Sequence, residues 1–120
     1  EWLEDLKPFK TNQFKPYLSK APYIIAVFAK LFDIVDGKKQ KYYYPIESTG
    51  IATGSLISCL HMSGLATLTH TPSPTHFINE ILGKPAHYRP MLLLVTGYPD
   101  KKTQVPKLHR KPFSELASFI

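Results

Sequence analysis

LLLVTGYPDKKTQVPKLHRKPFSEL, residues 92–116, is the stretch that decides how this chain of 120 residues folds. The apolar run Met91–Val95 predicts a buried strand, and Gly97 and Pro99 interrupt it. The residues that follow are rich in lysine, arginine and proline, and they show no helical or alternating period before Phe113. Because a tail of this kind cannot bury itself, we expect it to lie against another surface.

The composition is that of one small globular domain. The chain is 43% hydrophobic and 12% aromatic, which is typical of a protein with a packed core. Its 15 basic and 9 acidic side chains leave a net charge of +6, most of which we expect on a solvated surface. Lys38, Lys39 and Lys41 form a basic cluster that we expect in a turn. Nucleic-acid binding would need a known module or a basic stripe with aromatic platforms, and Tyr42–Tyr44 are only a faint sign of one. We therefore expect no nucleic-acid partner.

Helix and strand signals alternate along the chain and predict an α+β or α/β fold. Residues 45–62 carry apolar side chains around most of a long helix, which we expect to be central, and Gly64 suits its C-terminal cap. Gly50 and Gly54 lie four apart on that helix and would let another helix approach closely. The other expected elements are a short helix within residues 1–20, strands at 22–28, 65–71 and 89–97, a turn at Asp36–Gly37, and a helix from 74 or 75 to 82.

Several site classes have no sequence support. The single cysteine, Cys59, excludes a disulfide framework, and its apolar surroundings predict a packed thiol. The five histidines show neither an HExxH motif nor a paired i, i+4 spacing, so we expect no metal site. No apolar run approaches the length of a membrane span.

Five stretches, taken together and in order, resemble the nitroreductase-like flavoproteins, and within them the iodotyrosine deiodinase family. They are WLEDLKPFKTNQFKPYL (2–18), GIATGSLISCL (50–60), GLATLTHTP (64–72), ILGKPAHYRPMLLLVTGYP (81–99), and the tail with VPKL (105–108) and RKPF (110–113). The earlier half of that family, with an Arg-Arg-Ser phosphate site and the Glu and Tyr that grip substrate, has no match here. The resemblance therefore implies the C-terminal half of an α+β, nitroreductase-like FMN-binding domain, with a mixed sheet, a central helix and an extended C-terminal tail.

The resemblance also assigns residues to the flavin. It implies that the Thr71 side chain hydrogen-bonds the flavin N5 and so tunes its redox steps, which makes Thr71 the expected catalytic residue. Thr69 and His70 would line the flavin through backbone or side chain, although the family usually has a hydroxyl residue at the position of His70. Arg110 would reach the FMN phosphate. From spacing alone, the favoured interpretation is that Thr71 or Ser73 caps the helix expected from Pro74, and Arg110 is one more basic residue of the tail.

Lys15 is the expected substrate-binding residue. The resemblance places residues 1–20 in a lid and matches Lys15 to the lysine that pairs with the substrate carboxylate. Without the resemblance, Lys15 is one exposed surface charge among many. Residues 105–120 would be a tail that wraps the partner subunit of a homodimer.

The resemblance implies an enzyme, although residues 1–120 would form only part of it. The implied activity is the FMN-dependent reductive removal of iodide from mono- and diiodotyrosine, with NADPH as the ultimate electron donor. A general nitroreductase or halophenol dehalogenase is one alternative, and a non-catalytic dimerisation module is another. The sequence leaves localisation open: vertebrate members of the family are membrane-anchored, and the others are cytoplasmic.

Overall fold

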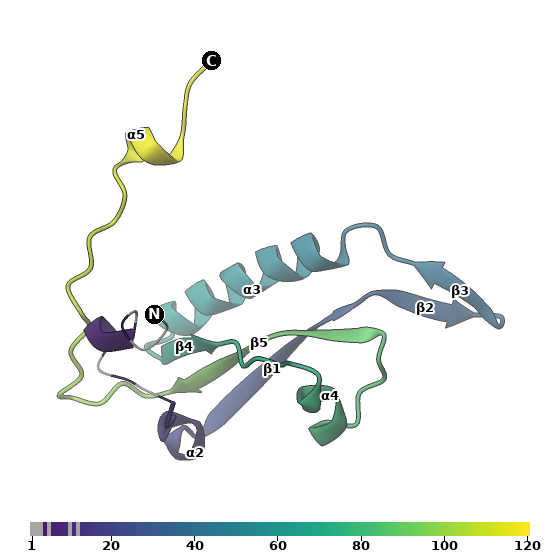
Figure 1. Cartoon of the computed structure of the whole chain (residues 1–120), viewed down its shortest axis with the longest axis horizontal. Helices are drawn as coiled ribbons and strands as arrows, with labels where there is room; N and C mark the ends of the chain where they lie inside the picture. Colours follow the sequence, from purple (N-terminus) through teal and green to yellow (C-terminus); the bar gives the residue numbers. More distant parts are fainter. Residues whose placement is uncertain (1–3, 5, 10, 12) are drawn as a thin grey trace. The chain divides into compact units, whose positions relative to one another are not determined.

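The computed structural model describes residues 4, 6–9, 11 and 13–120 (Figure 1). The chain divides into two compact units. One comprises residues 16–99 and holds the sheet and the long helix, and the other comprises residues 1–15 and 100–120. Part of the predicted lid, at residues 1–3, 5, 10 and 12, lies outside the described residues.

A three-stranded sheet forms the core of the first unit. Its strands are β1 (Tyr23–Lys30), β5 (Tyr88–Gly97) and β4 (Ala66–His70), in the order β1-β5-β4. β5 is central, and its apolar run is half-buried at Met91–Leu93 and buried from Leu94 onward, with Leu94 fully buried. That is why β5 is continuously apolar instead of alternating, and the strand predicted from this run is confirmed.

The expected mixed sheet is not seen among the described residues, because β1 and β4 both pair with β5 in antiparallel fashion. Antiparallel neighbours need no long crossover, and the connection between β4 and β5 holds only the short helix α4 (Phe77–Ile81). The α+β class is confirmed, and all three strands of the sheet lie within one or two residues of their predicted ranges.

The long helix α3 (Pro45–Met62) has the bounds that its sequence predicts. Pro45 occupies the first turn, Glu47 lies at the positive N-terminal end, and Gly64 follows the helix with a φ of 78°. α3 runs along the sheet and packs against β1 and β4 (Figure 1). No helix among the described residues is both long and apolar enough to cross a membrane.

Only one side of α3 is covered in this chain. Thr53 is its one buried residue, whereas the side chains of Ile51 and Met62 are 74% and 77% exposed. Cys59 is exposed as well, so the expectation of a packed thiol is wrong for this chain. The apolar residues on most sides of α3 therefore exceed what the sheet covers, and the outer face has no covering among the described residues.

A two-stranded hairpin precedes α3; the turn predicted at Asp36–Gly37 is confirmed, whereas its two strands were not predicted. It joins β2 (Phe32–Val35) to β3 (Lys38–Lys41) through Asp36 and Gly37, whose φ values of 51° and 75° suit a tight Asp-Gly hairpin turn. The basic cluster therefore lies on a strand and not in the turn. Lysines rarely signal a strand, and the pairing with β2 supplies what their propensity lacks.

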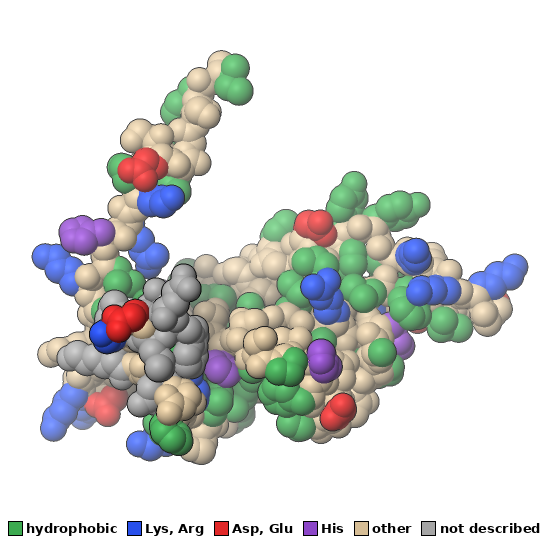
Figure 2. All heavy atoms as spheres, in the orientation of Figure 1, with side chains coloured by type: hydrophobic (Ala, Val, Ile, Leu, Met, Phe, Trp, Pro, Cys, Tyr) green, Lys and Arg blue, Asp and Glu red, His purple; other side chains and the backbone are tan. Residues whose placement is uncertain are grey.

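The hairpin is anchored at its base and exposed beyond it. Lys30 forms a 2.7 Å ion pair with Asp33, which lowers the pKa of the Asp33 carboxyl and raises that of Lys30. Ile34 of β2 is exposed, and so are Tyr43 and Tyr44, which connect the hairpin to α3. Figure 2 shows hydrophobic side chains and lysines gathered over the hairpin and the start of α3.

The second unit contains the shorter elements near both ends. A 3-10 turn, η1, spans Lys7–Phe9, and the tail holds one short helix, α5 (Phe113–Leu116), at the residue where the sequence regains a period. Residues 103–112 have no regular structure, and every residue from 98 to 120 is exposed in this chain. The extended tail predicted from the sequence is therefore present.

Gly97 allows β5 to end close to the segment before β1. A Cβ added at Gly97 would lie 2.8 Å from Cδ of Pro22, closer than side chains approach in folded proteins. We predict that Gly97→Ala destabilises the protein by about 1–3 kcal/mol, because the proline ring or the strand must move. Gly50→Ala is the control, since an added Cβ there meets nothing within 4 Å. Thermal unfolding midpoints compare each variant with the parent, and a midpoint for Gly97→Ala no lower than that of the parent would show that the close approach has no cost.

Candidate functional site

Three of the residues predicted to contact a cofactor lie together at the end of β4. Thr69 and His70 are the last two residues of the strand, and Thr71 follows directly. Thr69 pairs with Leu94 of β5, and His70 pairs with Leu93. Because Leu94 is fully buried, a slip of one residue would expose the core, so the packing of β5 sets the register of these three residues.

Side chains alternate along a strand, so Thr69 and His70 point to opposite faces of the sheet. Thr69 and Thr71 are exposed, whereas His70 is half-buried. The hydroxyl of Thr69 is thus open to a ligand on one face, and the imidazole of His70 lies on the other. Thr69 and His70 cannot both present side chains to a ligand on the same face of β4.

The His70 ring contacts Tyr17, the first residue of α2 (Tyr17–Lys20). The Tyr17 Oη lies 3.4 Å from the His70 Nδ1, and the rings meet edge to face with centroids 6.0 Å apart and planes at 79°. Burial raises the pKa of the Tyr17 phenol above its ordinary value of 10, so at neutral pH the phenol is a protonated donor. Tyr17 donates this hydrogen bond when Nδ1 carries no proton.

The donors at the end of β4 fit one part of a flavin. Flavin ring nitrogens and carbonyls accept hydrogen bonds, and exposed threonine hydroxyls at a strand end can supply them. A phosphate needs cationic groups instead, and none of these three residues is permanently charged. The residues therefore fit the flavin ring and not its phosphate.

Lys15 and Arg110 belong to the other compact unit. Lys15 is half-buried, and its Nζ donates a 3.2 Å hydrogen bond to Oγ1 of Thr11. Arg110 is exposed in the irregular part of the tail. Their roles toward substrate and phosphate stay predictions.

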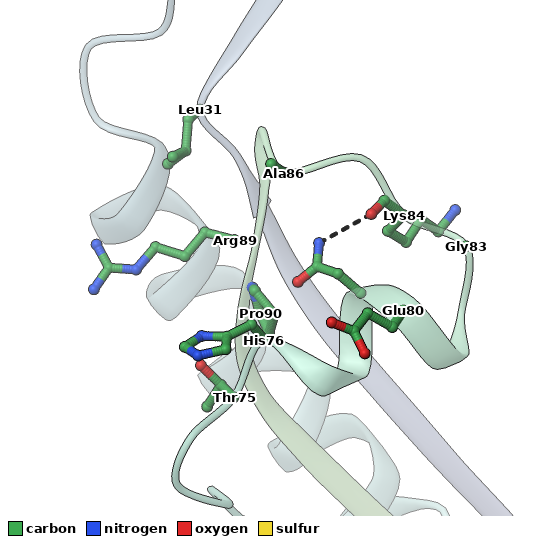
Figure 3. A pocket seen from close by; sticks show the side chains of 10 residues that line it. Leu31, Thr75, His76, Glu80, Gly83, Lys84, Ala86, Arg89 and Pro90 are labelled. Carbon is green, nitrogen blue, oxygen red and sulfur yellow. Dashed lines mark hydrogen bonds between the residues drawn. The ribbon is translucent and has the colours of Figure 1, made fainter.

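A cavity of about 740 Å³ lies beside α4 and the start of β5 (Figure 3). Its polar lining consists of Thr75, His76, Asn79, Glu80, Lys84 and Arg89. The Asn79 amide nitrogen lies within hydrogen-bonding distance of three carbonyl oxygens, those of Tyr88 (2.7 Å), Pro85 (3.1 Å) and Lys84 (3.3 Å), and its two hydrogens are shared among them. Asn79 therefore holds the loop before β5, a role that no motif in the sequence signalled.

Comparison with known proteins gives a consistent result. No protein-family model matches the chain. The iodotyrosine deiodinase of Haliscomenobacter hydrossis is 52% identical over 112 residues, which are 92% of this chain and 50% of that protein. Iodotyrosine deiodinase 1 of Homo sapiens is 40% identical over 119 residues, 96% of this chain and 40% of that protein. A crystal structure of oxidized iodotyrosine deiodinase bound to FMN and 3-iodo-L-tyrosine matches with a TM-score of 0.74 and 26% identity, over 91% of this chain and 54% of that one.

The chain is homologous to about half of an iodotyrosine deiodinase. The resemblance found in the sequence is thereby confirmed, and so is the nitroreductase-like fold. The chain spans about half the length of the curated deiodinases it matches. Among the described residues, no group of three or more His, Cys, Asp or Glu could hold a metal ion.

Asn79 offers a test of how the cavity wall is held. We predict that Asn79→Ala lowers the free energy of unfolding by about 1–3 kcal/mol, because three carbonyls lose their donor and that of Tyr88 is part-buried. Gln40→Ala, on the exposed strand β3, is the control and should change stability by no more than about 0.5 kcal/mol. Chemical denaturation measures both. A change for Asn79→Ala no larger than that for Gln40→Ala would show that the loop is held by other contacts.

Proposed function

We propose that the protein containing this chain is an FMN-dependent oxidoreductase that removes iodide reductively from mono- and diiodotyrosine. The observation that supports this most strongly is the 52% identity to an iodotyrosine deiodinase over 92% of the chain. The related structure with a TM-score of 0.74 was solved with FMN and 3-iodo-L-tyrosine bound, which supports the same cofactor and substrate class here.

The proposed reaction replaces iodine on the phenol ring with hydrogen. An aryl iodide takes up two electrons and one proton, the carbon–iodine bond breaks, and the products are the arene and iodide. Reduced FMN supplies the electrons. NADPH is the proposed ultimate donor, acting through another reductase. The protein's own task is to hold the substrate ring over the flavin and to adjust the hydrogen bonds to the flavin ring.

Each of the named residues has a distinct task in this proposal. The hydroxyl of Thr71 donates a hydrogen bond at the flavin N5, and Thr69 and the backbone of His70 line the flavin ring. Arg110 binds the phosphate as a fork of N–H donors that stays charged at all relevant pH values. Lys15 pairs with the carboxylate of the amino-acid substrate. An ammonium–carboxylate pair strengthens once a lid excludes water from it.

A homodimer is the proposed assembly. The exposed outer face of α3 and the exposed tail of residues 98–120 are both large surfaces that this chain leaves uncovered. Apolar side chains such as Ile51, Met62 and Phe113 are seldom left open together in a stable protein. In the proposed dimer, the tail of each subunit lies against the other.

The function is tested first on the protein expressed from its complete natural gene. We predict that it binds FMN in a 1:1 ratio per subunit and releases iodide from 3-iodotyrosine when a reductant is present. The isolated 120-residue chain should not hold FMN tightly, because it contributes the flavin-ring contacts and Arg110 but not the rest of the phosphate site. Flavin absorbance after gel filtration measures binding, and an iodide assay measures turnover.

Two results would contradict this. A complete protein that carries no flavin and releases no iodide would remove the proposed function and favour a non-catalytic dimerisation module. A stoichiometric yellow complex of the 120-residue chain alone would show that the cofactor site is contained within this half.

Lys15 separates a deiodinase of amino acids from a general halophenol dehalogenase or nitroreductase. We predict that Lys15→Gln weakens binding of 3-iodotyrosine by one to two powers of ten, since a charge-assisted contact contributes about 1.5–3 kcal/mol. Binding of 2-iodophenol, which has no carboxylate, should stay nearly unchanged. Quenching of the fluorescence of oxidised FMN measures both ligands.

Lys20→Gln is the matched control, because Lys20 is an exposed lysine of α2 five residues away. It should leave both affinities and the flavin content unchanged. Equal losses for iodotyrosine and iodophenol in Lys15→Gln would show that Lys15 orders the lid in general. No loss for either ligand would make Lys15 a surface charge.

A further inference from the structure

The contact between Tyr17 and His70 joins two segments that are 53 residues apart in the sequence. Tyr17 comes two residues after Lys15, and His70 comes directly before Thr71. Two residues of chain span at most about 7 Å, and adjacent α-carbons lie 3.8 Å apart. The contact is therefore tied closely, at one end, to the residue proposed to bind substrate. At the other end it is tied to the residue proposed to bind the flavin N5.

α2 has little else of its own to fix it. The helix has four residues, none of them buried, and no side chain caps its N-terminus. A helix this short is not stable by itself, because the free-energy cost of nucleating it exceeds the stabilisation from its few hydrogen bonds. Its position must come from tertiary contacts, and the edge-to-face contact of Tyr17 with His70 is a specific one.

β4, by contrast, is held firmly. His70 is paired with Leu93 of the central strand, and the neighbouring pair Thr69–Leu94 includes a fully buried side chain. The imidazole lies on the face of β4 opposite to the Thr69 hydroxyl, so it can hold Tyr17 without occupying the space of a ligand beside Thr69. A strand of the sheet thus carries a side chain that contacts the short helix at the end of the lid-like segment.

We propose that His70 is a positioning residue that, through Tyr17, links the lid-like segment to the flavin-binding end of β4. The inference rests on the proposed function and extends it. His70 does not touch substrate in this scheme. It holds α2, the helix that contains Tyr17 and begins two residues after Lys15, in a fixed register with the end of β4 and so with Thr71. A residue at position 70 with a hydroxyl but no ring would hold Tyr17 differently and would change substrate affinity without changing the flavin contacts.

The test uses the complete FMN-loaded protein and variants that differ in one group. Tyr17→Phe removes the hydroxyl and keeps the ring. His70→Leu removes the acceptor, and His70→Asn restores one near the position of Nδ1. Tyr43→Phe, on a tyrosine that is 93% exposed, is the matched control. The measurements are the dissociation constants of FMN and 3-iodotyrosine, and hydrogen exchange of the amides of residues 17–20 with and without 3-iodotyrosine.

We expect Tyr17→Phe and His70→Leu to bind 3-iodotyrosine about threefold to tenfold more weakly, the range for one neutral hydrogen bond. FMN affinity should stay within about twofold, and His70→Asn should recover most of the loss. 3-Iodotyrosine should slow exchange at residues 17–20 in the parent and in Tyr43→Phe, and should slow it much less in Tyr17→Phe.

The outcomes distinguish this link from the function on which it rests. A parent protein that shows no 3-iodotyrosine-dependent quenching would end the proposed function and the link with it. A parent that binds, with Tyr17→Phe and Tyr43→Phe binding equally well, would overturn the link alone. Parallel losses of FMN and 3-iodotyrosine affinity would also overturn it, because they would make His70 a residue of general stability.

Discussion

The pairing of β5 with both β1 and β4 is the constraint on which the rest of the first unit depends. β5 is the only strand with neighbours on both sides among the described residues, and its buried run around Leu94 forms the centre of the core. Each antiparallel pair that β5 makes fixes the position of the partner residue along the neighbouring strand. The position of Thr69, His70 and Thr71 at the edge of the sheet is therefore a consequence of packing, although their proposed task is chemical.

The same core is too small to cover all the apolar side chains of α3. One side of α3 packs on the sheet, and the other side leaves Ile51 and Met62 in contact with solvent. The removal of apolar surface from water is the main driving force of folding, and it contributes roughly 25 cal/mol per Å². A long helix that is uncovered on one side therefore loses much of this stabilisation. The proposed homodimer would cover part of this exposed surface.

Substrate selection in the proposed enzyme depends on two kinds of placement. In the proposal, the flavin contacts come from the end of β4, whereas the substrate contact comes from Lys15, which lies between η1 and α2. A reaction between two bound groups needs both held in one geometry, since misplacement of about 1 Å can cost a factor of a hundred in rate. Through the Tyr17–His70 contact, the strand β4 can fix the position of the short helix α2.

The sequence by itself determined the elements whose signals are local. The apolar run of β5, the capping residues of α3 and the break in periodicity before Phe113 each depend on neighbours within a few residues, and each appears at its expected place. The ordered motifs also identified the family, and with it Thr71, Arg110 and Lys15 as residues to test.

The tertiary structure alone decided what depends on partners far apart in the chain. The lysine-rich strand β3 exists because it pairs with β2, and the sheet is antiparallel because of how β4 and β1 flank β5. The exposure of Cys59 follows from which side of α3 the sheet covers. His70 and Tyr17 meet across 53 residues, which no local pattern records. Propensity and periodicity are short-range properties, whereas burial, pairing and side-chain contact are set by the whole packed unit.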